Sequence, residues 1–508
     1  MKKKPLSTGA EWTFDLIETY DREIARIAKD FKLDTYPNQL EIITAEQMMD
    51  SYASVGMPIG YNHWSFGKHF VGVEKSYQRG EMGLAYELVI NSNPCIAYLM
   101  EENTMAMQAL VIAHACYGHN SFFKNNYLFK MWTSADAIID YLVFAKNYIS
   151  ECEELHGIDE VEMVLDSCHA LMNYGVDRYK HPSPLSIQEE KIRQQNRAMY
   201  LQTQVNELWR TIPTNLNDKK NKDKIIFPSE PQENILYFIE KNAPLLQPWQ
   251  REIVRIVRKI AQYFYPQSQT KVMNEGWACF WHYTLLHALY DENLVTDEFM
   301  LEVLQNHTNV IMQPAYNSPY FSGINPYTLG YHMMQDIKRI CEAPTDEDKH
   351  WFPHLVNTDW ISSLDYAMRN LKDESFIAQY LSPHVIRELK LFSIIDDDKS
   401  PNLLVGAIHN EAGYQMIRES LSKQYNLASL DLDIQVLSVD LEGDRSLTLQ
   451  YKQQNRVPLG KTTNEVLKHL HSLWKFPVIL KAVDPNGEIT AEYHCPPITH
   501  AQNGHESV

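Results

Sequence analysis

Two histidines in the first third of the chain could bind one metal ion. His114 and His119 stand five residues apart in the segment HACYGH, and imidazole nitrogens are common ligands of zinc. Residues five apart lie about 140° from each other around an ideal α-helix, so a regular helix would point only one imidazole at an ion. A glycine can end or distort a helix, so Gly118 offers a way to turn His119 back. The alternative is that His114 is a hydrogen-bonded core histidine and that Gly118 only closes the helix.

A second group of chemically capable residues lies in the segment NEGWACFWH, residues 274–282. Glu275, Cys279 and His282 occupy positions i, i+4 and i+7, which share one face of a helix. The aromatic residues around them predict burial, and a buried ionisable group must be paired or bind a metal. Glu275 and His282 are about 10.5 Å apart along the helix axis, so only one of them can be a direct ligand.

We expect the ligand to be Glu275, because the adjacent Gly276 permits another element to approach closely. His282 would then not bind the metal itself, but would hydrogen-bond to a metal ligand or carry protons. The alternative for Glu275 is a buried pairing with a histidine or an arginine that holds two helices in register.

Two further pairs have the spacing i, i+3, namely Glu153 with His156 and Asp166 with His169. Di-iron helical bundles use a Glu-x-x-His motif on each of two helices, with a carboxylate from each of two others. One pair here has aspartate in place of glutamate, and both pairs fall within one helical hairpin. The pattern therefore favours ordinary helix-end and surface positions over a di-iron site.

The composition excludes several classes of function. Lys and Arg number 46 against 65 Asp and Glu, for a net charge of −19, whereas proteins held to nucleic acid by bulk charge need a basic surface. The sequence has no phosphate-binding loop, dinucleotide fingerprint or serine-hydrolase elbow. Seven scattered cysteines without a Cys-x-x-Cys pair are typical of reduced thiols. With no signal peptide and no apolar run of about 18 residues, we expect a cytoplasmic protein without a membrane span or a nucleic-acid partner.

The elements that must position these residues are helices. Apolar residues recur at helical spacing over much of residues 11–395, and the sequence predicts helices over 101–115 and 274–290. Residues 313–326 alternate proline, glycine and aromatic residues, which favours a long ordered loop. The fold class we expect is mainly α, with one large helical domain over residues 1–395.

A polar break at residues 396–401 separates this domain from a small module at residues 400–508. Beyond the break the pattern changes to strand, helix, strand, strand, helix and strand, followed by a final hairpin. This order predicts an α+β module of the ferredoxin-like kind, beginning with a strand at residues 403–409.

Four strings of sequence resemble the stage V sporulation protein R (SpoVR) family, in the version found in Gram-negative bacteria. They are NSNPCIAYLMEENT at 91–104, HACYGHNSFFKNNYLFK at 114–130, MNEGWACFWHY at 273–283 and GINPYTLGYHMMQDIKRIC at 323–341. The resemblance implies a role in spore cortex formation in spore formers and in stationary-phase, starvation and stress responses elsewhere. It also implies two partners, a PrkA-type serine kinase and a von Willebrand-like protein.

These observations lead to two hypotheses. In the first, His114, His119 and Glu275 bind a divalent metal, zinc by preference, in a hydrolase-like site. Glu102 or its neighbour Glu101 would serve as an added ligand or general base, and His282 as a proton carrier. In the second, the protein is a regulatory adaptor without chemistry that works with the serine kinase.

Overall fold

Helices make up most of the structure, as the sequence predicts. The computed structural model describes residues 4–53, 60–61, 63–64, 87–179, 192, 196, 227–316, 318–319, 321–395, 404–426, 432–453 and 459–496. The polar break predicted at 396–401 lies outside them. The chain forms two compact units, one of residues 1–151 with 263–430 and one of residues 152–262 with 431–508. No helix in the described ranges is long and apolar enough to cross a membrane.

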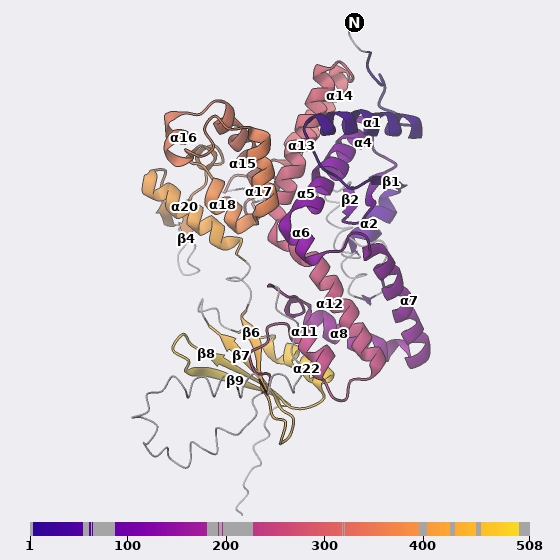
Figure 1. The fold of residues 1–508 in the computed structure, drawn as a ribbon, viewed down its shortest axis with the longest axis vertical. Coiled ribbons are helices and arrows are strands. Elements are labelled where there is room, and N and C mark those ends of the chain that lie inside the picture. Colours follow the sequence, from indigo (N-terminus) through magenta and orange to yellow (C-terminus); the bar gives the residue numbers. More distant parts are fainter. Residues whose placement is uncertain are drawn as a thin grey trace, which may run out of the picture. The chain divides into compact units, whose positions relative to one another are not determined.

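The first unit is built mainly from helices (Figure 1). Its helices are α1 (Phe14–Asp30), α2 (Ala45–Ala53), α4 (Met105–Val111), η1 (Ile112–His119), α5 (Asn120–Asn125), α6 (Tyr127–Trp132), α7 (Ile138–His156), α13 (Lys271–Asp291), α14 (Asp297–Val310), α15 (Pro326–Glu342), α16 (Asp346–Trp351), α17 (Trp360–Asn370), α18 (Asp373–Tyr380), α19 (Pro383–Glu388) and α20 (Glu411–Gln424). The last residues of α7 belong to the second unit.

Helix α13 is the centre of the first unit and packs against both α15 and η1 (Figure 1). Most of its residues are buried, including Trp277, Phe280 and Trp281. A helix that is apolar around its whole circumference must be enclosed by other elements. This explains why the sequence of α13 shows no clear polar face, and why the site residues that it carries are buried.

A small sheet in the first unit was not predicted from the sequence. It contains β1 (Asn38–Ile43), β2 (Glu87–Ile90) and β3 (Cys95–Met100), in the order β1-β3-β2. Strand β3 pairs with β1 in parallel and with β2 in antiparallel orientation. Helix α4 therefore begins at Met105, after the turn that follows β3, and the predicted helical start at residue 101 is wrong.

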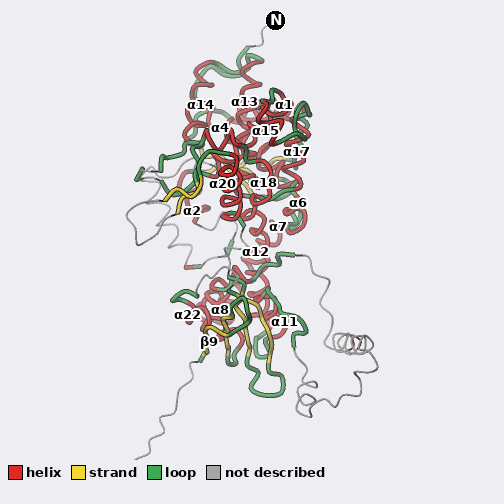
Figure 2. The backbone as a smooth tube through the Cα atoms, turned by 90° about the vertical axis from the view of Figure 1, so that its left-hand side faces the viewer, coloured by secondary structure: helices red, strands yellow, loops and turns green. Residues whose placement is uncertain are grey.

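The second unit combines helices with a four-stranded sheet. Its elements are α8 (Ile158–Ala170), the short η2 (Met172–Tyr174), α11 (Ile235–Asn242), most of α12 (Pro248–Gln269), β6 (Ile434–Val439), β7 (Leu447–Lys452), α22 (Thr463–Trp474), β8 (Val478–Val483) and β9 (Ile489–Cys495). The strands lie in the order β6-β7-β8-β9, with β7 and β8 parallel. Helix α22 packs against β8, β9 and α8 (Figure 2).

The ferredoxin-like arrangement expected for residues 400–508 is not confirmed. Strand β5 (Leu404–Ala407) pairs with β4 (Ser393–Ile395), not with the four-stranded sheet. The helix that follows, α20, packs on α18 in the first unit. The compact units thus divide the chain at other points than residues 395 and 400, and the predicted domain bounds stay a prediction.

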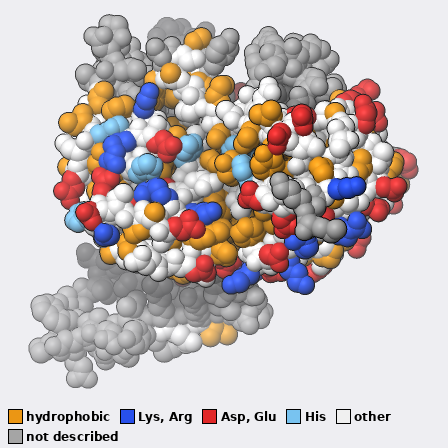
Figure 3. All heavy atoms as spheres, turned by 90° about the horizontal axis from the view of Figure 1, so that it is seen from above, with side chains coloured by type: hydrophobic (Ala, Val, Ile, Leu, Met, Phe, Trp, Pro, Cys, Tyr) orange, Lys and Arg blue, Asp and Glu red, His pale blue; other side chains and the backbone are white. Residues whose placement is uncertain are grey.

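Charged side chains of both signs are scattered among apolar ones on the face shown in Figure 3. Several pairs lie close enough for ion pairing, such as Arg26 with Glu292 at 2.7 Å and Arg387 with Glu347 at 2.6 Å. Exposed pairs of this kind contribute little to stability.

Candidate metal centre

A π-helical turn brings the two histidines of the first motif together. Helices α4, η1 and α5 run without interruption from Met105 to Asn125, and η1 is a π-helix over Ile112–His119. A π-helix bonds residue i to residue i+5, so residues five apart lie one turn apart on the same side. The ring centroids of His114 and His119 are 4.7 Å apart. Gly118 was expected to end or distort the helix, and the structure shows the distortion: the helix widens and does not end there.

Residues without bulky side chains let three helices approach one another at this point. A β-carbon placed on Gly118 would lie 2.6 Å from Cα of Ala278 on α13. A β-carbon on Gly276 would lie 2.4 Å from the backbone of Gly330 on α15. Both separations are too short for real atoms, so these positions require glycine. The prediction that Gly276 permits close approach of another element is confirmed.

Glu275 faces both histidines across this contact. Its Oε2 atom lies 3.4 Å from Nε2 of His119 and 3.9 Å from Nε2 of His114. Ligand atoms about 2.0–2.1 Å from a tetrahedral zinc ion are about 3.3–3.4 Å from one another. One ligand atom from each of the three residues lies within 4.8 Å of the other two. The donor set and its spacing therefore fit a divalent metal after small side-chain movements.

The electrostatic environment keeps the Glu275 carboxylate charged. Burial raises the pKa of Glu275, but in the metal-free protein the charge and the N–H groups of the protonated His119 and His114 imidazoles outweigh this effect and hold the pKa well below its usual value. The Oε2 atom is buried and faces the Nε2 atoms of both imidazoles. The side chain as a whole is 18% exposed, whereas that of His114 is fully buried. Glu275 is thus the member of the group that reaches toward solvent.

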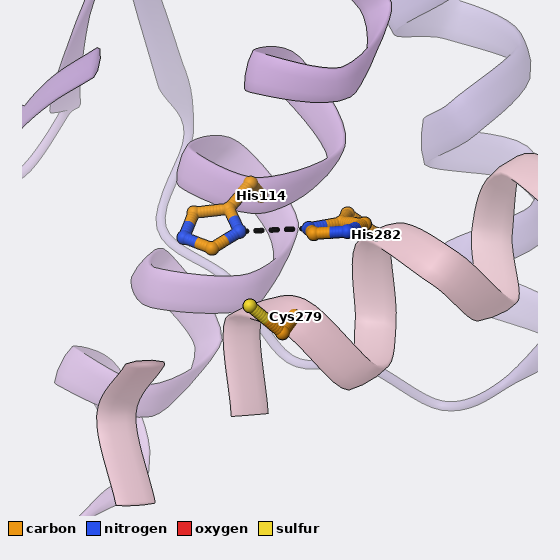
Figure 4. Close-up of side chains that lie close together, drawn as sticks. All are labelled: His114, Cys279 and His282. Atoms are coloured by element: carbon orange, nitrogen blue, oxygen red, sulfur yellow. Dashed lines mark hydrogen bonds between the residues drawn. The ribbon is translucent and has the colours of Figure 1, made fainter. Parts of the chain in front are cut away.

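Each histidine is oriented by a hydrogen bond at its other ring nitrogen. His119 Nδ1 lies 2.9 Å from Oδ1 of Asn274, an acceptor, so His119 carries its proton on Nδ1. His114 Nδ1 lies 2.8 Å from Nδ1 of His282 (Figure 4). Metal-binding histidines usually have such a partner, which fixes the tautomer and the ring orientation. Both Nε2 atoms are left facing Glu275.

A second set of possible ligands shares His114 but fits a metal less well. His114, Cys279 and His282 also offer ligand atoms within 4.8 Å of one another, and Figure 4 shows Cys279 beside this pair on the same helix as His282. However, the two imidazoles meet at hydrogen-bonding distance, 2.8 Å, which is shorter than the spacing of zinc ligands. No other group of this kind is found among the described residues.

The remaining predicted residues divide between the site and other places. His282 lies next to His114, as expected of a residue that hydrogen-bonds to a metal ligand. Glu102 does not join the cluster: it is exposed in the turn after β3, where its Oε1 accepts a hydrogen bond from the Ala45 amide. Its neighbour Glu101 is exposed in the same turn. From the alternative di-iron motif, His156 stacks on Trp249 in the second unit, with ring centroids 4.4 Å apart.

One residue of the site was missed by sequence reasoning. His307 on α14 has its Nδ1 atom 2.7 Å from Nε2 of His282. Burial lowers the pKa of His307 to about 4. Burial also holds the pKa of His282 well below its usual value, and the neighbouring His307 adds to this effect. Both imidazoles are therefore neutral at pH 7. His307 stands alone in a helix of mixed composition, so nothing in its surrounding sequence marks it.

Fold and site together define a mainly helical protein with a buried histidine–glutamate cluster between two of its central helices. Residues 11–430 match the family described as SpoVR like protein, and residues 432–485 match the SpoVR-like C-terminal domain. The chain belongs to the SpoVR family. It is 63% identical over 492 residues to a protein of Escherichia coli (strain K12) named uncharacterized protein YcgB, covering 97% of this chain and 96% of that protein. No solved structure matches the chain.

Proposed function

We propose that His114, His119 and Glu275 bind a divalent metal ion, zinc by preference, and that the protein is a metal-dependent hydrolase. The observation that carries the proposal is the approach of a buried, charged carboxylate oxygen to two imidazole nitrogens at 3.4 and 3.9 Å. Two histidines and one glutamate form the ligand set of several zinc hydrolases, which leave a fourth position open for water or substrate.

A zinc ion held by these residues would lower the pKa of water to about 7 and would polarise a carbonyl group. Neighbouring residues orient the ligands. Asn274 and His282 hold the two imidazoles in the orientation that presents Nε2. The Glu275 side chain is partly exposed, although the oxygen that faces the imidazoles is buried. Glu102 is not given a role in this proposal, because its side chain is engaged with Ala45.

The setting of this activity is also a proposal. The family resemblance implies a cytoplasmic protein of the stationary-phase and starvation response that works with a PrkA-type serine kinase and a von Willebrand-like partner. A hydrolase in that setting would act on a target selected by those partners. The test below uses simple substrates.

The activity test compares protein freed of metal by a chelator with protein to which zinc is returned. A panel of chromogenic esters, amides and phosphoesters serves as substrates for the wild type, Glu275→Gln and Asp291→Asn. Asp291 is an exposed acidic residue at the end of the same helix, so its variant is a matched control. Zinc should restore turnover in the wild type and the control, but not in Glu275→Gln.

Two results would contradict the proposal in different ways. Turnover that is unaffected by the chelator would show that the reaction does not use the cluster. A protein that binds zinc but turns over none of the substrates would remove the hydrolase assignment. In that second case, co-purification of a kinase in fixed ratio would favour the regulatory adaptor, with the metal as a structural element.

A further inference from the structure

Three imidazoles form a continuous buried chain that starts at the candidate metal ligand His114. His114 Nδ1 lies 2.8 Å from His282 Nδ1, and His282 Nε2 lies 2.7 Å from His307 Nδ1. The three residues come from η1, α13 and α14. Their exposed fractions are 0%, 0% and 3%, so bulk water does not compete for these hydrogen bonds.

The hydrogen bonds along three neutral imidazoles can all be donated in only one of two directions. A neutral imidazole has one N–H donor and one acceptor nitrogen, so each ring that donates on one side must accept on the other. In one direction His114 donates to His282, which donates to His307. In the other direction His307 donates to His282, which donates to His114, and the Nε2 atom of His114 then carries a proton.

Metal binding is compatible with only the first direction, because a ligand nitrogen must have its lone pair available. We propose that His307 is a positioning residue that accepts a hydrogen bond from His282 and thereby fixes His114 in the tautomer with an unprotonated Nε2. This inference rests on the proposed metal centre and extends it by one residue on a third helix. In this arrangement His282 connects the ligand His114 to His307 through its two ring nitrogens.

The proton balance follows from the geometry. When the direction changes, one proton leaves His114 Nε2, one crosses each of the two hydrogen bonds, and one enters at His307 Nε2. The total number of protons on the three imidazoles is therefore unchanged. His307 Nε2 is buried and has no hydrogen-bond partner among the described residues. The rings of Tyr331 and Tyr283 lie beside the His307 imidazole, with centroids 4.7 and 4.9 Å from its own.

The inference is tested by replacing His307 with side chains that can or cannot accept a hydrogen bond. The zinc affinity of the full-length protein is measured by competition with a chromogenic chelator for the wild type, His307→Phe and His307→Gln. His287→Phe is the matched control. His287 also lies beside Tyr283, but its Nδ1 bonds to the Tyr283 carbonyl oxygen and not to any of the three linked imidazoles.

We expect His307→Phe to weaken zinc binding by about 10–100-fold, the usual effect of losing a partner of a ligand histidine. His307→Gln should stay close to the wild type, since its amide oxygen accepts from His282. The control should bind zinc as the wild type does. Equal affinity of His307→Phe and the wild type would overturn the inference while leaving the metal centre in place. No zinc binding by the wild type would instead remove the proposed function itself.

A second measurement does not depend on whether His307→Phe folds. In wild-type protein labelled with ¹⁵N-histidine, nitrogen chemical shifts distinguish protonated from unprotonated ring nitrogens. In the zinc-bound form, Nε2 of His282 should be protonated and its Nδ1 unprotonated, with the signals assigned through His282→Gln. The reverse pattern in the zinc-bound form would overturn the inference.

Discussion

His119 Nε2 lies 3.4 Å from Glu275 Oε2, although the two residues belong to helices far apart in the sequence. The contact depends on two backbone features that act together. The π-helical turn of η1 places His119 on the same side as His114, and the absence of a side chain at Gly118 lets η1 touch α13 at Ala278. Without either feature, the carboxylate and the imidazoles would not converge.

Gly118→Ala should therefore damage both the fold and the metal centre. The added β-carbon would lie 2.6 Å from Cα of Ala278, so the two helices must move apart. Such overpacking costs about 1–3 kcal/mol, which urea unfolding measures. Gly9→Ala is the control, because nothing lies within 4 Å of its β-carbon. A Gly118→Ala protein with unchanged stability and unchanged zinc affinity would refute the claim that this contact builds the site.

Replacing Asn274 should affect metal binding through the orientation of His119. Asn274→Leu removes the oxygen that accepts from His119 Nδ1, and we expect zinc affinity to fall by about 10–100-fold. Asn274→Asp keeps an acceptor oxygen and should bind zinc like the wild type. Calorimetric titration with zinc distinguishes the two variants. If both lose zinc equally, the hydrogen bond is not what orients the ring.

The metal-free protein should lose stability in acid partly because His307 is buried in its neutral form. The pKa of His307 is about 4 in the folded protein, below the value of about 6.5 expected in the unfolded chain. Between these values the unfolded chain binds a proton that the folded protein does not. Folding stability therefore falls as the pH drops through this range, by up to about 1.4 kcal/mol per pH unit.

The measurement is urea unfolding at several pH values in the presence of a chelator. His307→Gln removes the titrating group, so the stability of the wild type relative to this variant should decrease from pH 6.5 to pH 4. A constant difference between the two proteins over this range would contradict the assignment of a neutral, buried His307.

Asp373 should give a pH dependence of the opposite sign. It is 1% exposed, and its two oxygens accept hydrogen bonds from the Val272 and Met273 amides at the start of α13. Burial raises the pKa of Asp373 to about 7 despite these bonds. The folded protein then binds more protons than the unfolded chain between the unfolded value of about 3.9 and pH 7. The stability relative to Asp373→Asn should fall as the pH rises through this interval, and a rise would contradict the raised pKa.

The helical character of the fold was predictable because helical periodicity is a local signal. Helix α13, expected at 274–290, runs from Lys271 to Asp291. The sheet of β1, β2 and β3 was not predicted, because β1 pairs with β3 across a long stretch of chain and β2 is only four residues long. The pairing of β5 with β4 was missed because β4 has only three residues and gives almost no strand pattern. Strand partners are decided by tertiary contacts that a strand's own sequence does not contain.

The ligand residues of the candidate site were predictable from residue type, but their geometry was not. A spacing of five residues is unfavourable for two ligands on an α-helix, and only the π-helical turn of η1 resolves it. Glycine at 118 indicates an irregularity, a helix end or a distortion, but does not specify a π-helical turn. Glu102 was suggested by its membership of a motif string, whereas the chain turns at that point and exposes it. His307 carries no local signal and is recognised only through its contact with His282.

The most direct test of the central claim is the metal content of the full-length protein after zinc reconstitution and removal of excess metal. Elemental analysis is applied to the wild type, His119→Gln, Glu275→Gln and the control Asp291→Asn, each first shown to be folded by circular dichroism. The metal-centre proposal predicts one tightly bound zinc ion per chain in the wild type and the control, and loss of that ion in the two ligand variants. Equal metal content in all four proteins, or none in the wild type, would contradict it.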